Sequence, residues 1–244
     1  MPMFASLSAA VAQLSDPRLR AILWRAVGLA LVVFAALWAA AWYGLSQASA
    51  ALAGDPAASG FWHDVLAWLV GLGGVAAVLI ASFLLFPAVM GLCQSFFLED
   101  AADAVEARHY PGLPPAREQP VLEGLRDGLN LAGVTLLVNL IALPLYMILS
   151  VLPPLNLVVF YAVNGYLLGR EYFEVVAVRR LSRADMAVTR RRFRVRVVLA
   201  GVAIAVMLTI PLVNLFAPVV ATAFMVHVFE GVRQRAGLPA LPRS

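Results

Sequence analysis

The chain contains no lysine, and all 18 of its basic residues are arginine. Charged residues of both signs make up only 13% of the 244 residues, where soluble domains carry about 25%. Hydrophobic residues make up 62%, more apolar surface than a soluble domain of this size can bury. The shortage of charge therefore excludes an ordinary soluble domain. It favours a single all-α domain whose solvent is lipid.

Cysteine and histidine are also scarce. Cys93 is the single cysteine, so no internal disulfide can form. The three histidines are isolated in sequence, and the chain has no H-E-x-x-H, G-x-S-x-G or P-loop motif. We therefore expect no enzyme, no metal site and no cofactor. Because much of the arginine adjoins apolar stretches, we also expect no nucleic-acid partner.

Two segments are long enough to cross a bilayer as single helices. Residues 3–14 place apolar side chains on one helical face, which predicts an interfacial helix over 1–16 or a packed cytoplasmic one. Asp16-Pro17 then starts a transmembrane helix over 17–45, with an aromatic belt at its far end. A second long helix is predicted over 65–108, continuing beyond the membrane. The arginine-free segment 46–64 is predicted to lie outside.

Two further apolar regions are interrupted by prolines: 129–169 at Pro144 and Pro153-Pro154, and 197–229 at Pro211 and Pro218. Arginines flank both ends of each region, so all four ends are predicted to lie on the cytoplasmic side, as are both chain termini. Each region must then enter and return on that side. In the second region each arm has about 14 to 16 residues, which is too short for a core of about 30 Å. Two Pro-broken, re-entrant helical hairpins are therefore predicted over 129–180 and 183–235. Whether the first fully spans is open. Between the hairpins, Ser182-Arg183-Ala184-Asp185 resembles a capping box, which predicts a single helix that restarts there and runs to about Ile210.

The tips of the two hairpins share a Pro-x-x-Asn-Leu pattern. It begins at Pro153 with Asn156, and again at Pro211 with Asn214. Non-helical backbone at membrane depth needs polar partners or water. One interpretation is that the asparagines cap the freed backbone groups. The other is that the tips line a polar cavity of a transport site.

The start of the first spanning helix combines free N–H groups with the guanidinium groups of Arg18 and Arg20. Such a helix start suits an oxyanion, although the same arginines also suit anchoring to lipid headgroups. Ionisable residues at the ends of the first hairpin form a second candidate group, because buried charges pair or line a pathway. They are Arg126, Arg170, Glu171 and Glu174.

Two stretches carry a resemblance to a known family. Ile210-Pro211-Leu212-Val213-Asn214-Leu215-Phe216 resembles the terminal hairpin of the bacterial CysZ sulfate permeases, whose superfamily includes the eukaryotic etoposide-induced 2.4 proteins. Asp16-Pro17-Arg18-Leu19-Arg20 is similar to the Pro-Gly-Leu-Arg element that begins their first transmembrane helix. Here Arg18 stands in place of the glycine. Glu171-Tyr172-Phe173-Glu174 also replaces an Asp-Tyr-Pro-x-Asp-Asn stretch of the bacterial members.

The resemblance implies a sulfate permease or channel of the bacterial inner membrane that feeds cysteine biosynthesis and forms a homo-oligomer. It also implies that backbone N–H groups and arginine at Arg18, Leu19 and Arg20 bind sulfate. An alternative from the residues themselves is a non-transporting scaffold. Its arginine-rich stretch 179–196 would bind anionic lipid or a cytoplasmic partner.

Overall fold

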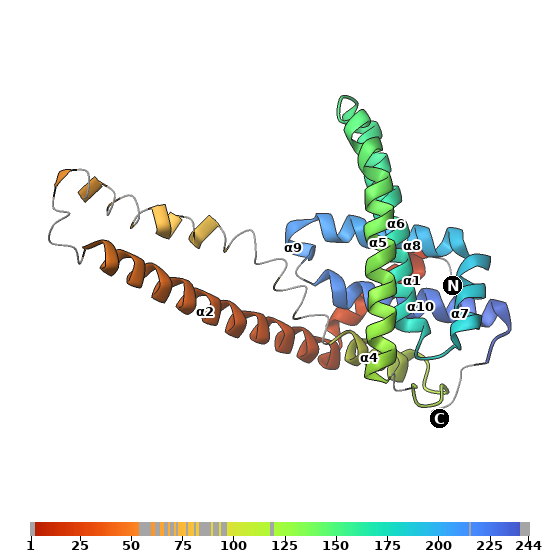
Figure 1. The fold of residues 1–244 in the computed structure, drawn as a ribbon. Coiled ribbons are helices and arrows are strands. Elements are labelled where there is room, and N and C mark those ends of the chain that lie inside the picture. Colours follow the sequence, from red (N-terminus) through yellow and green to blue (C-terminus); the bar gives the residue numbers. More distant parts are fainter. Residues whose placement is uncertain are drawn as a thin grey trace. The chain divides into compact units, whose positions relative to one another are not determined.

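The computed structural model describes residues 3–53, 97–117, 120–214 and 216–239, with scattered residues between 60 and 93. Every regular element among these residues is helical, which confirms the predicted all-α class (Figure 1). Residues 46–53 of the predicted outside loop are helical and belong to the first long helix, while residues 54–59, 62 and 63 lie outside the described part.

The chain divides into two compact units. The first comprises Met1–Ile22 together with Phe97–Ser244, and the second comprises Leu23–Phe96. Helix α2 (Pro17–Ala53) begins in the first unit and forms most of the described part of the second.

Helix α10 (Ala217–Ala236) is the core of the first unit. Its residues are buried without interruption from Ala217 to Glu230. The helices that pack most extensively on it are α1 (Met3–Ala12), α4 (Leu98–His109), α6 (Pro153–Ala177) and α8 (Arg194–Thr209). A helix that is hydrophobic on all sides is stable only when it is covered on all sides. The apolar run of α10 is therefore accounted for by protein contacts.

Helices α5 (Val121–Leu149) and α6 form the arm predicted as the first hairpin, with a turn before Pro153. We expected Pro144 to break this region, and that expectation is wrong, because α5 continues through it. Membrane helices tolerate proline where local adjustments satisfy the freed backbone groups. With 29 residues, α5 is about 43 Å long, which exceeds the bilayer core.

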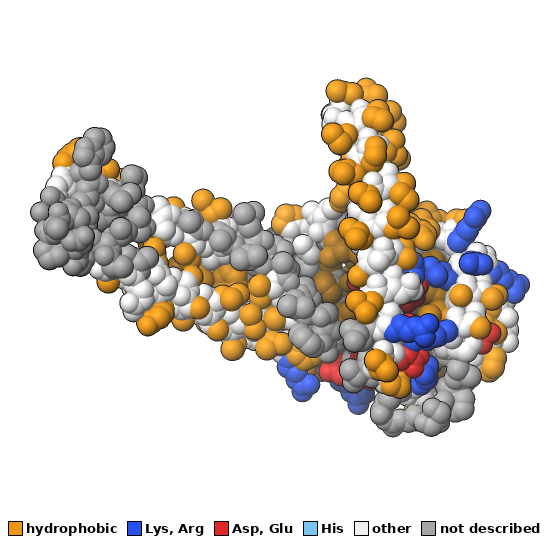
Figure 2. All heavy atoms as spheres, in the orientation of Figure 1, with side chains coloured by type: hydrophobic (Ala, Val, Ile, Leu, Met, Phe, Trp, Pro, Cys, Tyr) orange, Lys and Arg blue, Asp and Glu red, His pale blue; other side chains and the backbone are white. Residues whose placement is uncertain are grey.

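The surface of this arm is apolar. Leu136, Ile141 and Ile148 on α5 and Val158 on α6 are each more than 60% exposed. Figure 2 shows hydrophobic side chains covering the arm toward its tip on the visible face. Exposed apolar surface of this extent is typical of lipid contact.

The second predicted hairpin begins as expected and then differs. Ser182 caps α7 (Arg183–Arg192), because its Oγ accepts from the Asp185 N–H at 3.1 Å. The predicted single helix is interrupted at Phe193, where α7 ends and α8 begins. Breaks near Pro211 and Pro218 are present, with the short helix α9 (Pro211–Asn214) between α8 and α10.

In the described part of the chain, two helices are long and apolar enough to cross a membrane, over Pro17–Gln47 and Leu122–Leu149. The first is the predicted span, and the second belongs to the predicted hairpin arm. Many residues of the helix predicted over 65–108 lie outside those described. Phe97 forms a turn, and α4 begins after it.

In the second unit, α2 contacts a segment that follows it in the chain. Trp38 Nε1 donates to Ser82 Oγ at 2.8 Å. A Cβ added at Gly74 would lie 2.4 Å from Cδ1 of Leu45, so the glycine permits close approach there. Trp42 and Tyr43 are exposed, as an interfacial belt requires.

Candidate functional site

The first turn of α2 is built by Asp16 and Pro17. Asp16 has extended backbone and ends a 3₁₀ turn (Gln13–Ser15) that leads out of α1. Its Oδ1 accepts from the Arg18 N–H at 2.8 Å, and its carbonyl accepts from the Arg20 N–H at 2.9 Å. Asp16 is therefore the N-cap of α2, and Pro17 occupies the first helical position, where its missing N–H costs nothing.

Arg108 of α4 neutralises the Asp16 carboxylate. Its guanidinium lies 2.5 Å from Asp16 Oδ2, and its side chain remains 54% exposed. The hydrogen bond from Arg108, followed by that from the Arg18 backbone, holds the pKa of the Asp16 carboxyl below its ordinary value. The carboxylate is thus charged at neutral pH, and its charge is paired.

The predicted anion ligands flank this cap. Leu19 is buried at 1% exposure, while Arg18 and Arg20 are exposed. Residues two apart on a helix do not face each other, but side chains of the first turn tilt toward the helix N-terminus. The two side chains therefore leave different faces of the first turn and tilt toward the N-terminal end of α2. Because Asp16 already accepts from the Arg18 N–H, the backbone donor that remains is that of Leu19.

Gln13 adds an unsatisfied amide one turn before the helix. The residue is 3% exposed, and neither Nε2 nor Oε1 has a hydrogen-bond partner among the described residues. Buried polar groups are paired in the great majority of structures, so an unpaired amide favours a polar ligand or water beside it.

The second predicted group is brought together only in part. Arg170 Nε donates to Glu174 Oε1 at 2.8 Å, and Arg190 approaches the same oxygen at 3.6 Å. Glu171 is partly buried on α6. Arg126 lies exposed on α5, and the described residues contain no ion pair joining it to this group. A role for these four residues in conduction stays a prediction.

The predicted tips carry the two asparagines at intermediate exposure. Pro153 starts α6, but Oδ1 of Asn156 is buried and has no partner within the described part of the chain. Capping by this oxygen is therefore not seen. Pro211 starts α9, whose backbone is satisfied locally, since the Asn214 N–H donates to Ile210 O at 2.8 Å.

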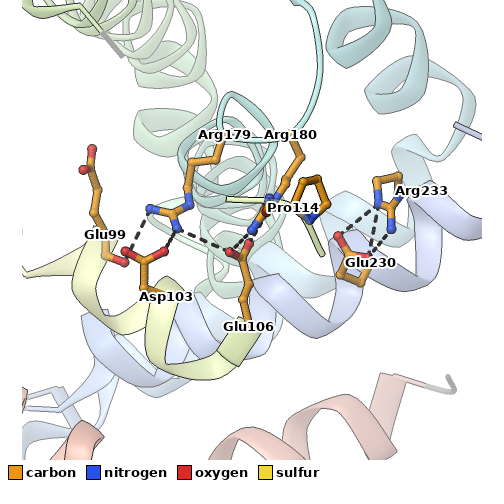
Figure 3. A network of polar contacts seen from close by, with 8 residues as sticks. All are labelled: Glu99, Asp103, Glu106, Pro114, Arg179, Arg180, Glu230 and Arg233. Carbon is orange, nitrogen blue, oxygen red and sulfur yellow. Dashed lines mark hydrogen bonds and ion pairs between the residues drawn. The ribbon is translucent and has the colours of Figure 1, made fainter. Parts of the chain in front are cut away.

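A buried charge cluster that the sequence did not predict joins α4 to the residues just after α6 (Figure 3). Glu106 is 4% exposed and accepts from Arg179 and Arg180, which are equally buried. Arg180 also donates to the carbonyl of Pro114, and Arg179 to Asp103. The helical spacing of the acids was visible in the sequence, but nothing local indicated their partners more than 70 residues away.

A buried histidine lies beside the C-terminal end of α4. His227 of α10 forms a 2.9 Å hydrogen bond between its Nδ1 and the Tyr110 hydroxyl, and its ring packs edge-on against His109 at 5.0 Å. Burial raises the pKa of Tyr110 to about 12, so the phenol stays protonated. Among the described residues, no group of three potential ligands could hold a metal ion.

These features define a helical membrane protein with a paired, arginine-flanked helix start. A family model described as sulfate transporter CysZ/etoposide-induced protein 2.4 matches residues 6–218, and the chain belongs to this family. The family is of transporter type. The matched residues include both segments that resemble it, 16–20 and 210–216. A search of curated proteins finds no match.

Proposed function

We propose that the protein is a permease or channel that imports sulfate, or a closely related oxyanion, across the bacterial inner membrane for cysteine biosynthesis. The start of α2 is the binding site in this proposal, with Arg18, Leu19 and Arg20 as its ligands. Membership of a family described as sulfate transporters supports the substrate class. The observation that carries the proposal is the pairing of Asp16 with Arg108.

That pairing removes the main electrostatic objection to an anion at this position. An unpaired carboxylate at the helix end would repel sulfate, whereas Arg108 neutralises it. The helix dipole, the guanidinium groups and the Leu19 N–H then give a net positive site. The unsatisfied amide of Gln13 supplies a further donor nearby.

The proposal places the second hairpin partway into the bilayer from the cytoplasm. Helix α8 is about 24 Å long, short of a full crossing. The tip of this hairpin exposes the apolar side chains of Ile210, Val213 and Phe216, as contact with lipid requires. In α1, Phe4 and Val11 are exposed while Ser6 and Ala10 are buried, an arrangement that suits an interfacial helix.

Replacing Arg20 by glutamine should reduce sulfate uptake at least about tenfold, because a charge-assisted hydrogen bond to the anion contributes about 1.5 to 3 kcal/mol. The measurement is uptake of labelled sulfate by proteoliposomes holding the purified protein. Arg25→Gln is the matched control, since it removes an exposed guanidinium from the same helix beyond its first turn. Wild-type uptake no greater than that of empty liposomes would contradict the proposal. Equal loss in both variants would show that the start of α2 is not the sulfate-binding site.

Replacing Asp16 by asparagine should tighten sulfate binding about tenfold, because it leaves the Arg108 guanidinium without its counter-charge and so makes the site more positive. Asparagine is an equally good N-cap, so the start of α2 is retained. Titration calorimetry of sulfate into the purified protein measures the change. Asp100→Asn removes an exposed carboxylate from α4 and serves as the control. An unchanged affinity in Asp16→Asn would show that the anion binds elsewhere.

A further inference from the structure

An open pocket of about 380 Å³ lies where α7 meets α8 in the first unit. Residues from α1, α8 and the end of α10 contribute to its wall, together with the α7–α8 junction. Its lining combines arginines with apolar side chains: Met3, Arg192, Phe193, Val195, Arg196, Leu199 and Arg235.

The charge of the pocket lining is of one sign. Three guanidinium groups line it, and none of the lining residues within the described part of the chain is acidic. Between Asp185 and Glu230 the sequence contains no acidic residue, and the Glu230 carboxylate is held by Arg233 at 2.7 Å. Burial lowers the pKa of the Arg196 guanidinium, and the neighbouring charge of Arg235 lowers it further. A phosphate group is attracted to a lining that carries several guanidinium groups.

The rest of the lining is apolar and open. Val195 is 65% exposed and Leu199 is 51% exposed, and both lie on α8 as it leaves the arginine-rich stretch. The guanidinium of Arg192 lies 5.5 Å from the centroid of the Phe193 ring, which orients it beside the apolar wall. A small inorganic anion uses only the arginines, whereas a phosphodiester with attached acyl chains uses both halves of the pocket.

We propose that this pocket binds the headgroup of an anionic phospholipid, with its phosphate on Arg192 and Arg235 and its acyl chains along Val195 and Leu199. The pocket lies at the base of the second hairpin, on the predicted cytoplasmic side, where anionic headgroups and acyl chains meet. Basic pockets at that depth of a helical membrane protein suit such headgroups. A bound lipid would hold α1, α8 and the end of α10 together.

The test is native mass spectrometry of the full-length protein in detergent, titrated with phosphatidylglycerol or phosphatidylcholine. We expect phosphatidylglycerol to bind at least about tenfold more tightly. The double variant Arg192→Gln/Arg235→Gln should lose this preference. The matched double variant Arg191→Gln/Arg194→Gln removes the same charge from exposed residues outside the pocket and should keep it.

Equal binding of the two lipids would overturn the proposal, as would equal losses in the two double variants, which would mean diffuse attraction to the surface. Competition with inorganic phosphate tests whether the pocket prefers the phosphate of a lipid headgroup or free phosphate. Leu199→Ser should weaken phosphatidylglycerol binding without changing the binding of inorganic phosphate. If inorganic phosphate displaces the lipid as effectively as phosphatidylglycerol does, the pocket is a site for free anions and the lipid proposal fails.

Discussion

Replacing Gly201 by leucine should prevent the protein from folding, and even Gly201→Ala should lower its melting temperature by about 5 to 10 °C. A Cβ at this position would lie 1.9 Å from the carbonyl oxygen of Gly165 and 2.4 Å from the backbone nitrogen of Gly169. Both are backbone atoms, so no side chain can rotate to make room. Helices α6 and α8 cross with their backbones in contact, and any added carbon must push them apart.

Small residues four apart permit such crossings in membrane proteins. The reciprocal contact is equally tight, because a Cβ at Gly169 would lie 2.4 Å from the Val197 carbonyl oxygen. Circular dichroism melting and size-exclusion chromatography in detergent measure the loss. Gly133→Ala on α5 is the control, because nothing lies within 4 Å of its added Cβ and alanine favours a helix. If Gly201→Ala melted like Gly133→Ala, the close crossing would not exist.

Local signals in the sequence predicted several features of this fold. Asp16-Pro17 started a helix as expected, and the Ser182 cap was placed correctly, because both depend on residues within one turn. The breaks at Pro211 and Pro218 were also local. The apolar composition predicted that lipid is the solvent of the protein, because a soluble domain of this size cannot bury that much apolar surface.

Features set by tertiary packing were not predicted. Pro144 was expected to break α5, yet the helix continues. Phe193 was expected to continue a helix and instead separates α7 from α8, although no glycine or proline stands there. The burial of α10 was equally invisible, because an apolar helix covered by other helices has the same composition as one covered by lipid.

The candidate site also has one part that the local sequence predicts and another that depends on tertiary packing. Its helix start is encoded in five consecutive residues, from Asp16 to Arg20. The partner that neutralises Asp16 is Arg108, 92 residues away, and no spacing rule connects them. The sequence therefore indicated an anion site with an opposing carboxylate, and only the packing of α4 supplied the compensating charge.

Replacing Glu106 by glutamine should destabilise the protein by about 3 to 5 kcal/mol, because it leaves two buried guanidinium groups without their shared counter-charge. Arg180 Nε lies 3.3 Å from Glu106 Oε1, and Arg179 lies 3.4 Å from Oε2. Glutamine has nearly the same shape, so the effect measures charge and not volume. Melting in detergent should show the loss, and proteolysis should increase around Pro114, whose carbonyl accepts from Arg180.

Asp103→Asn is the control on the same helix. Asp103 also contacts Arg179, but its side chain is 61% exposed, and exposed ion pairs contribute about 0 to 1 kcal/mol. The two substitutions therefore remove one negative charge each and differ in burial. Replacing the whole charged cluster by apolar residues, with Glu106→Leu, Arg179→Met and Arg180→Leu, should recover much of the stability lost in Glu106→Gln. Such replacements of buried ion pairs are often neutral. Equal losses in Glu106→Gln and Asp103→Asn would mean that burial does not govern this cluster.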